Sequence, residues 1–169
     1  MEVIVTEELL KPKDFDRYLK DNKLVIPNYH YAVIALLTDV NRHVILQRRG
    51  PKSRDDSNML ADIGGAVEKD DLTFRDALYR EIHEEVGNKA NIEIDKFVGC
   101  FLQKKYEPRS KCDVNWLFMV YKCNYIDGEL LINENGKCLG YELFDINYLP
   151  KSEMLETTKG FWDFYLKTF

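Results

Sequence analysis

The segment REIHEEVG, Arg80–Gly87, places glutamates where a helix should carry apolar side chains. A helix from about Thr73 to Val86 has one apolar face, which consists of Phe74, Ala77, Leu78 and Ile82. Glu81 and Glu85 fall within this face, and Glu84 lies beside it. An unpaired buried carboxylate is costly in free energy, so the pattern predicts a partner that neutralises these glutamates. The alternative interpretation is an ordinary solvated helix face.

A divalent cation is the simplest partner for the three glutamates. Hard cations such as Mg²⁺ and Mn²⁺ take oxygen ligands from a few carboxylates, water and substrate phosphates. Two neighbouring features fit such a site. Arg80 lies next to Glu84 on the helical wheel and can orient one carboxylate by a forked hydrogen bond. Gly64 and Gly65 end an apolar segment and allow a backbone carbonyl to approach a metal.

The spacing of these residues resembles the Nudix hydrolase signature, G-x5-E-x7-R-E-U-x-E-E-x-G-U, in which U is a bulky aliphatic residue. The second half of the signature is matched by Arg80, Glu81, Ile82, Glu84, Glu85 and Gly87. The first half departs from it, because Asp71 replaces the first Glu and eight residues, instead of seven, separate Asp71 from Arg80. Asn88 occupies the last aliphatic position. The resemblance therefore covers a 24-residue box with one insertion and two substitutions.

The resemblance implies an α/β (α+β) fold, the Nudix-type α/β/α sandwich with a mixed β-sheet between helices. It also implies metal-assisted attack of water on the phosphoanhydride bond of a nucleoside diphosphate linked to another moiety, with Mg²⁺ or Mn²⁺ as cofactor. The implied metal ligands are Glu81, Glu84, Glu85 and the Gly65 carbonyl, and the implied catalytic residues are Glu84, Glu85, Arg80 and Glu134. Glu134 stands for the further carboxylate that family members commonly draw from a loop outside the box, and Glu142 is the alternative.

Three arginines are expected to bind the substrate. Arg48 and Arg49 end a predicted strand, where similar hydrolases often place a phosphate-contacting arginine. Adjacent residues of a strand point to opposite faces, so only one of the two should reach the pocket readily. Arg54 and Lys52 lie in the loop that follows. Three aromatic residues either pack in the core or stack on a base: Tyr29, Tyr31 and Trp116.

Other functions within the same family remain open. The segment ILQRRGPKSRDDSNMLADIGG resembles the coenzyme A pyrophosphatase pattern at Arg49 and Arg54, but Asn58, Asp62 and Ile63 depart from it. The layout also resembles the prenyl-diphosphate isomerase branch, although the cysteine and glutamate expected there are not evident. A non-catalytic module that senses a nucleotide or ADP-ribose is the third alternative. The complete glutamate set favours the enzyme, because a sensor has no need for a costly cluster of carboxylates.

Length and charge limit the class of protein. The 169 residues suit one domain, and a net charge of −5 argues against binding a nucleic acid polymer. The N-terminal MEVIVTEELLK is not expected to be a signal peptide, and the longest apolar run, Ala32–Leu37, is too short to span a membrane. The four cysteines form no C-x-x-C pair, which predicts reduced thiols in a cytoplasmic protein. The expected partner is a small-molecule nucleoside diphosphate derivative, and a homodimer is left open.

The chain is expected to divide at residue 28. Residues 1–28 form an N-terminal extension that packs on the domain, and residues 29–169 form the Nudix domain. The first two strands of the domain are expected to form a hairpin, and a C-terminal helix at Glu156–Phe169 is expected to turn Phe161, Trp162 and Tyr165 inward. The strands are expected at Tyr29–Leu37, His43–Arg49, Ile92–Gln103, Asn115–Cys123 and Lys137–Phe144.

Overall fold

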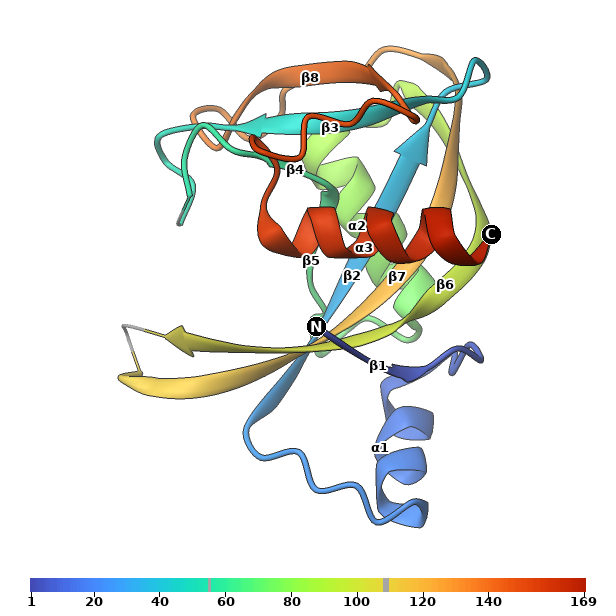
Figure 1. Ribbon diagram of the computed structural model, residues 1–169, viewed down its shortest axis with the longest axis vertical. Helices are drawn as coiled ribbons and strands as arrows, with labels where there is room; N and C mark the ends of the chain where they lie inside the picture. Colours follow the sequence, from blue (N-terminus) through green and yellow to red (C-terminus); the bar gives the residue numbers. More distant parts are fainter. Residues whose placement is uncertain (55, 108–109) are drawn as a thin grey trace.

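A computed structural model describes residues 1–54, 56–107 and 110–169. In these residues one mixed sheet of eight strands lies between helix α2 and helix α3, as Figure 1 shows. The α/β/α sandwich predicted from the sequence is therefore confirmed. The elements are β1 (Glu2–Val5), α1 (Pro12–Asp21), β2 (Tyr29–Thr38), β3 (His43–Arg49), β4 (Leu60–Ala61), β5 (Ile63–Ala66), α2 (Phe74–Val86), β6 (Ala90–Glu107), β7 (Cys112–Gly128), β8 (Cys138–Asp145) and α3 (Glu156–Thr168).

The centre of the sheet is a parallel pair of strands. β2 runs parallel to β7, from Tyr29 opposite Asn115 to Thr38 opposite Asn124. The strand order is β1-β6-β7-β2-β3-β4, and β5 pairs with β2 while β8 pairs with β3. The predicted antiparallel pairing of β2 with β3 is confirmed, but it is limited to the closed end, where Thr38 pairs with Val44. A strand has only two edges, and those of β2 are occupied by β7 and β5, so β3 diverges and pairs with β8 and β4.

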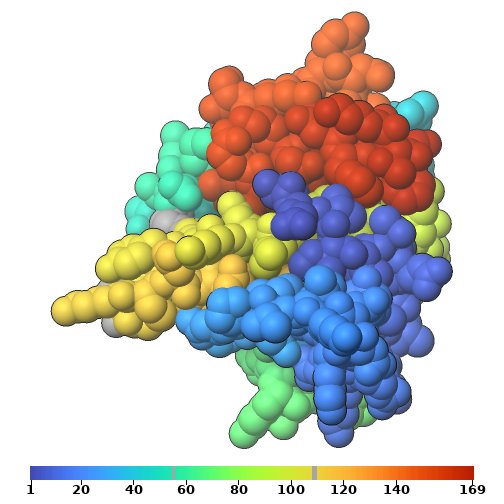
Figure 2. Space-filling view, turned by 60° about the horizontal axis from the view of Figure 1, so that its bottom comes forward, coloured from blue at the N-terminus to red at the C-terminus, as the bar shows by residue number. Residues whose placement is uncertain are grey.

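β6 and β7 are longer than the sequence pattern indicates. They pair with each other from Ala90 opposite Gly128 to Glu107 opposite Cys112. The outer residues of both strands lack an apolar alternation, and their extended conformation depends on the cross-strand hydrogen bonds. The resulting two-stranded arm protrudes from the body of the protein (Figure 2).

Each face of the sheet buries its own apolar cluster. On one face, α2 contributes Phe74, Ala77, Leu78 and Ile82, which are at most 2% exposed. On the other face, α3 contributes Phe161 and Trp162, with Tyr165 packed partly buried beside them. α2 begins where the Thr73 hydroxyl accepts a hydrogen bond from the Asp76 N–H, and it ends at Gly87, whose φ of 81° favours glycine.

The first 28 residues contribute to the same sheet and core. β1 pairs antiparallel with β6, and Phe15 of α1 is fully buried against the α2 side. The hydroxyls of Tyr29 and Tyr31 both donate to Asp16 of α1, at 2.8 and 2.6 Å. These two tyrosines therefore fasten α1 to the sheet. The four cysteines are free thiols, and no helix in the described part of the chain is both long and apolar enough to cross a membrane.

Candidate active site

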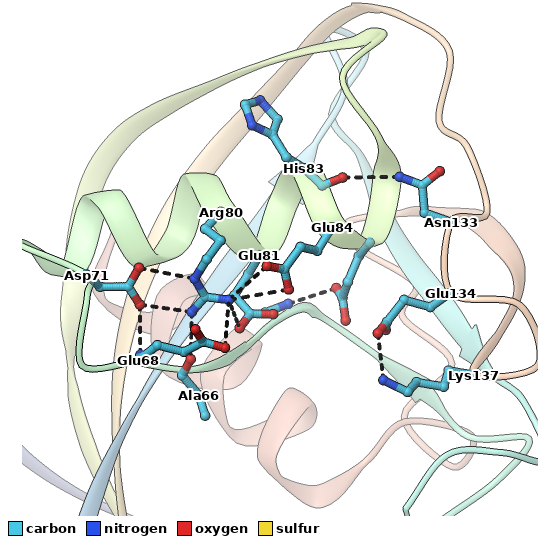
Figure 3. Close-up of polar contacts among 12 residues, drawn as sticks. Ala66, Glu68, Asp71, Arg80, Glu81, His83, Glu84, Asn133, Glu134 and Lys137 are labelled. Atoms are coloured by element: carbon cyan, nitrogen blue, oxygen red, sulfur yellow. Dashed lines mark hydrogen bonds and ion pairs between the residues drawn. The ribbon is translucent and has the colours of Figure 1, made fainter.

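Arg80 holds the carboxylates along α2 in place. Its Nε and Nη2 donate to the two oxygens of Asp71, at 3.1 and 2.9 Å. Its Nη1 donates to Glu81 at 2.8 Å and to Glu84 at 3.3 Å, and Nη2 also donates to the Ala66 carbonyl at 2.9 Å (Figure 3). All five N–H groups of the guanidinium are thus used. Arg80 thus contacts the carboxylates themselves, and its predicted place among the catalytic residues stays a prediction.

Asp71 anchors this arginine from the loop before α2. Its side chain is 8% exposed and also accepts the backbone N–H of Glu68 at 2.8 Å. The Arg80 guanidinium holds the pKa of Asp71 below its usual value. Asp71 has a shorter side chain than the Glu of the signature, and the box contains an extra residue. A carboxylate nevertheless contacts Arg80.

Glu81 lies against the glycine turn of β5. Its carboxylate is so close that a Cβ on Gly65 would come within 2.5 Å of Oε2. The side chain is 12% exposed, and burial raises its pKa in spite of the Arg80 hydrogen bond. A side chain at position 65 would therefore displace this carboxylate from its place beside the backbone.

Glu85 is the most strongly perturbed carboxylate of the helix. Its oxygens accept hydrogen bonds from Gln47 Nε2, at 3.2 and 3.3 Å, and from the backbone N–H of Gly64, at 3.0 Å. Burial raises the pKa of Glu85 to about 8, because these two donors offset only part of the desolvation and the charges of Glu81 and Glu134 raise it further. Both of these donors are neutral groups, so neither of them supplies a positive charge to Glu85.

These residues fit a hard divalent cation. Within residues 1–54, 56–107 and 110–169, no three His, Cys, Asp or Glu side chains already converge as a metal site. Instead, Glu81 and Glu84 accept hydrogen bonds from Arg80, and Glu85 accepts hydrogen bonds from Gln47. Three features nevertheless match the chemistry of Mg²⁺ or Mn²⁺. The ligand atoms are oxygens, the hydrogen bonds of Glu85 do not offset the cost of its burial, and Glu81 closely approaches Gly65.

Glu134 reaches the same site from the segment between β7 and β8. This segment is attached to the last turn of α2 by a hydrogen bond from the Asn133 N–H to the Glu85 carbonyl, at 3.3 Å. Glu134 accepts a hydrogen bond from Lys137 Nζ at 2.6 Å. Figure 3 shows this pair on the side of α2 that carries the glutamates, whereas His83 points to the opposite side.

Arg48 and Glu142 lie on the other face of the sheet. Arg48 Nε donates to Glu142 at 2.6 Å, and its other nitrogens bind Glu153 and the Asn58 carbonyl, each at 2.9 Å. The Arg48 guanidinium holds the pKa of Glu142 below its usual value. The predictions that Arg48 binds the substrate and that Glu142 is the alternative base are therefore corrected. Strand alternation turns both side chains away from the glutamates.

Two adjoining chambers open beside the glutamates. The acidic chamber, about 320 Å³, is lined by Glu81, Glu84, Glu85 and Glu134, together with Lys137. The aromatic chamber, about 700 Å³, is lined by Tyr106, Trp116, Phe118 and Phe161. The walls that the two chambers share include Gln47, Arg49, Arg54, Gly64, Gly65 and Glu85.

Arg49 and Arg54 thus lie where the chambers meet. Arg54 forms an ion pair with Glu107 at the end of the β6–β7 arm. This contact joins the loop after β3 to the arm, and the two lie side by side in Figure 2. Of the three arginines predicted from the sequence, the structure brings these two to the glutamates and leaves Arg48 outside.

Two polar side chains at the site, Gln47 and Lys137, were not predicted from the sequence. Gln47 could have been found, because it lies two residues before Arg49 and therefore shares its strand face. Lys137 reaches the acidic chamber only through the attachment of the β7–β8 segment to α2, for which the sequence carries no local signal.

We expect the metal-free protein to lose stability as pH rises from about 5 to about 8. The folded pKa of Glu85, about 8, lies above its ordinary value of 4.5, so the folded state retains a proton that the unfolded state has released. The stability from this proton is fully present below about pH 4.5 and is lost as pH rises through about 8. The pKa of Asp62, raised to about 7 by burial, acts in the same direction.

Thermal unfolding in EDTA, at steps from pH 5 to pH 8.5, measures this effect. Glu85→Gln removes the titrating group, so its Tm should fall less across the range than that of the wild-type protein. Asp71 and Glu142 do not contribute to this change in stability. Their pKa values are lowered in the folded state, so the stability that they contribute changes only at pH values below 5. Parallel curves for wild type and variant would show that Glu85 does not carry the raised pKa.

Solved structures share this fold. A MutT Nudix hydrolase from Burkholderia pseudomallei is 18% identical, with a TM-score of 0.62 over 80% of this chain and 97% of that chain. A MutT protein from Methanosarcina mazei Go1 is 18% identical, with a TM-score of 0.67 over 85% of this chain and 98% of that chain. A UDP-X diphosphatase is 18% identical, with a TM-score of 0.58 over 94% of this chain and 73% of that chain. At these identities the likeness shows the fold alone.

The family is established by the sequence itself. Among curated proteins no relative matches the chain. The model of the NUDIX domain, however, matches residues 28–163, which is most of the chain and includes both chambers and the glutamates of α2. The chain therefore belongs to the NUDIX family.

Proposed function

We propose that the protein hydrolyses a phosphoanhydride bond in a nucleoside diphosphate linked to another moiety, with Mg²⁺ or Mn²⁺ as cofactor. One observation carries this proposal: the acidic chamber with its glutamates opens into a larger aromatic chamber, and two arginines lie where they meet. In this proposal the diphosphate lies at the junction, and the organic group lies in the aromatic chamber. The UDP-X diphosphatase among the structural neighbours has a name that agrees with this substrate class.

The glutamates of α2 supply the ligands in this proposal. Glu81, Glu84 and Glu85 would hold the cation together with the Gly65 carbonyl, and Arg80 fixes the first two by hydrogen bonds. A bound divalent cation polarises phosphoryl oxygens and lowers the pKa of a bound water. Gln47 and the Gly64 N–H fix the orientation of the Glu85 carboxylate. A bound cation would supply the positive charge that these neutral donors do not.

Glu134 is proposed as the proton acceptor. It lines the acidic chamber, and Lys137 fixes one of its oxygens at 2.6 Å. The water oxygen forms a bond to one phosphorus, the bridging oxygen leaves with the other, and the water proton passes to the Glu134 carboxylate. The products are a nucleoside monophosphate and the phosphorylated second moiety.

The two neighbouring arginines of β3 should differ sharply when each is replaced by alanine. Arg49 lines both chambers, so Arg49→Ala should raise KM for the best substrate by about tenfold or more, as expected for one charge-assisted phosphate contact. Arg48→Ala is the matched control, because Arg48 binds Glu142 and Glu153 on the other face. Steady-state kinetics of both variants measures the difference. Equal KM values for the two variants would exclude Arg49 from substrate binding.

A substrate screen tests the function itself. Nucleotide sugars, dinucleoside polyphosphates, ADP-ribose, coenzyme A and deoxynucleoside triphosphates should each be incubated with the protein, with and without Mg²⁺ or Mn²⁺. We expect metal-dependent formation of two phosphomonoesters from at least one nucleoside diphosphate derivative. Binding without any product would instead favour a sensing module, and isomerisation of a prenyl diphosphate without hydrolysis would favour the isomerase branch. The cytoplasmic location, the homodimer and the boundary at residue 28 stay predictions.

A further inference from the structure

A buried aspartate forms part of the wall of the aromatic chamber. Asp62 lies between β4 and β5 and is 6% exposed. Carboxylates are rarely buried in this way unless they are paired with a cation. The neighbouring residues in the chain are apolar, with Leu60 and Ala61 before it and Ile63 after it. The position is therefore one that fold stability alone would fill with an apolar residue.

Only part of the Asp62 hydrogen-bonding capacity is used inside the protein. Trp162 Nε1 of α3 donates to Oδ1 at 2.8 Å, and the backbone N–H of Asp62 donates to the Thr158 hydroxyl at 3.3 Å. The Asp62 carbonyl accepts from Gln47 Nε2 at 3.1 Å. The second carboxylate oxygen, Oδ2, is buried and has no hydrogen-bond partner among the described residues. A buried acceptor without a donor is destabilising, so above pH 7, where the carboxyl has lost its proton, this oxygen lacks a donor among the described residues.

The chamber is shaped for a flat ring. Trp116 and Phe118 lie on β7, with ring centroids 6.3 Å apart, and Phe161 of α3 packs on Phe118 at 5.4 Å. Aromatic side chains of this kind stack on any planar heterocycle but do not distinguish one from another. Asp62 lines the same chamber and binds the fully buried Trp162, whereas Tyr106 at the end of the arm is exposed. An aromatic wall and a carboxylate thus line one and the same chamber.

We propose that Asp62 is a specificity-determining residue that selects a heterocyclic base with an exocyclic amino group, whose N–H donates to the free carboxylate oxygen. The proposal deepens the proposed function, on which it rests for placing a nucleoside in this chamber. Gln47 links the two regions, since its Nε2 binds both the Asp62 carbonyl and the Glu85 carboxylate.

The chemistry favours amino over oxo bases. An amino group supplies the donor that Oδ2 lacks, whereas a ring carbonyl in the same place would bring two acceptors together and leave both unsatisfied. A site built around a hydrogen bond rejects analogues without it far more strongly than an apolar pocket rejects a change of size. The hydrogen bond to Trp162 fixes the carboxylate, so the two oxygens have separate roles.

Binding of four nucleoside monophosphates tests the proposal independently of hydrolysis. AMP and IMP, and likewise CMP and UMP, differ at one position where an amino group is replaced by a carbonyl. Calorimetry with the protein at pH 8.5, above the Asp62 pKa of about 7, should show that AMP and CMP bind at least about tenfold more tightly than their oxo counterparts. Asp62→Asn should abolish or reverse this difference, because Trp162 Nε1 holds the amide oxygen and the amide NH2 then takes the free position as a donor.

Asp163→Asn is the matched control. Asp163 lies on α3 next to Trp162, but its carboxylate binds Lys151 at the surface, so this variant should keep the wild-type preference. Equal affinities within each pair for the wild-type protein, or no binding of any of the four at millimolar concentration, would overturn the proposal whether or not Asp62→Asn folds. Hydrolysis without amino preference would refute only the role of Asp62. Amino preference without hydrolysis would refute only the proposed function.

Discussion

Glu85→Gln is expected to lower kcat by more than about 100-fold, equivalent to about 2.7 kcal/mol in the barrier. The substitution keeps the size of the side chain but removes the charge that we propose binds the metal. The backbone N–H of Gly64 can still donate to the remaining carbonyl oxygen, so the fold should persist. Single-turnover rates at saturating Mg²⁺, with circular dichroism to verify folding, measure the effect.

Glu142→Gln is the control for this variant. Glu142 carries the same charge but binds Arg48 on the other face of the sheet, so its loss should leave kcat within about threefold of the wild-type value. A decrease of less than tenfold for Glu85→Gln would show that Glu85 does not bind the metal. Similar losses in both variants would indicate a general effect of negative charge.

Arg80→Ala is expected to reduce both stability and activity. It removes five donors and leaves Asp71, with a side chain 8% exposed, without its cation. Breaking a buried ion pair by removing one partner costs about 3–5 kcal/mol. Arg80 is 22% exposed and partly screened by solvent, so we expect about 2–3 kcal/mol here. Urea unfolding at pH 7 in EDTA measures the change.

Arg75→Ala separates a stability effect from an effect on the site. Arg75 lies on the same helix and makes a forked contact with Glu8, at 2.8 and 3.0 Å, away from the chambers. This control should lose some stability but keep kcat at a temperature where it is folded. Arg80→Ala should lose activity at that temperature as well, because Glu81 and Glu84 lose their shared donor. Full activity in folded Arg80→Ala would refute its positioning role.

Local sequence patterns predicted the elements that carry the site. The span of α2 agrees to one residue with its prediction, because an apolar face at helical spacing, a Thr73 cap and a terminal Gly87 all act within one helix. The inward position of Glu81 and Glu85 follows from the same spacing. Strand alternation likewise predicted that Arg48 and Arg49 separate, since the two-residue period of a strand is a local property.

The tertiary structure decided how these elements combine. Which of Arg48 and Arg49 faces the glutamates depends on the pairing of β3 with β8, whose residues are about a hundred positions away in the chain. Because of the same pairing, Glu142 lies outside the site. Because the β7–β8 segment is attached to α2, Glu134 lies within it.

The sequence by itself therefore determined the family, the helix and the three inward-turned or neighbouring glutamates, since each rests on residues close together in the chain. Only the tertiary structure revealed the use of all five Arg80 donors, the contact of Gln47 with Glu85 and the unpartnered oxygen of Asp62. Hydrogen bonding and desolvation depend on which distant side chains share a buried volume, and no local period of the sequence encodes that.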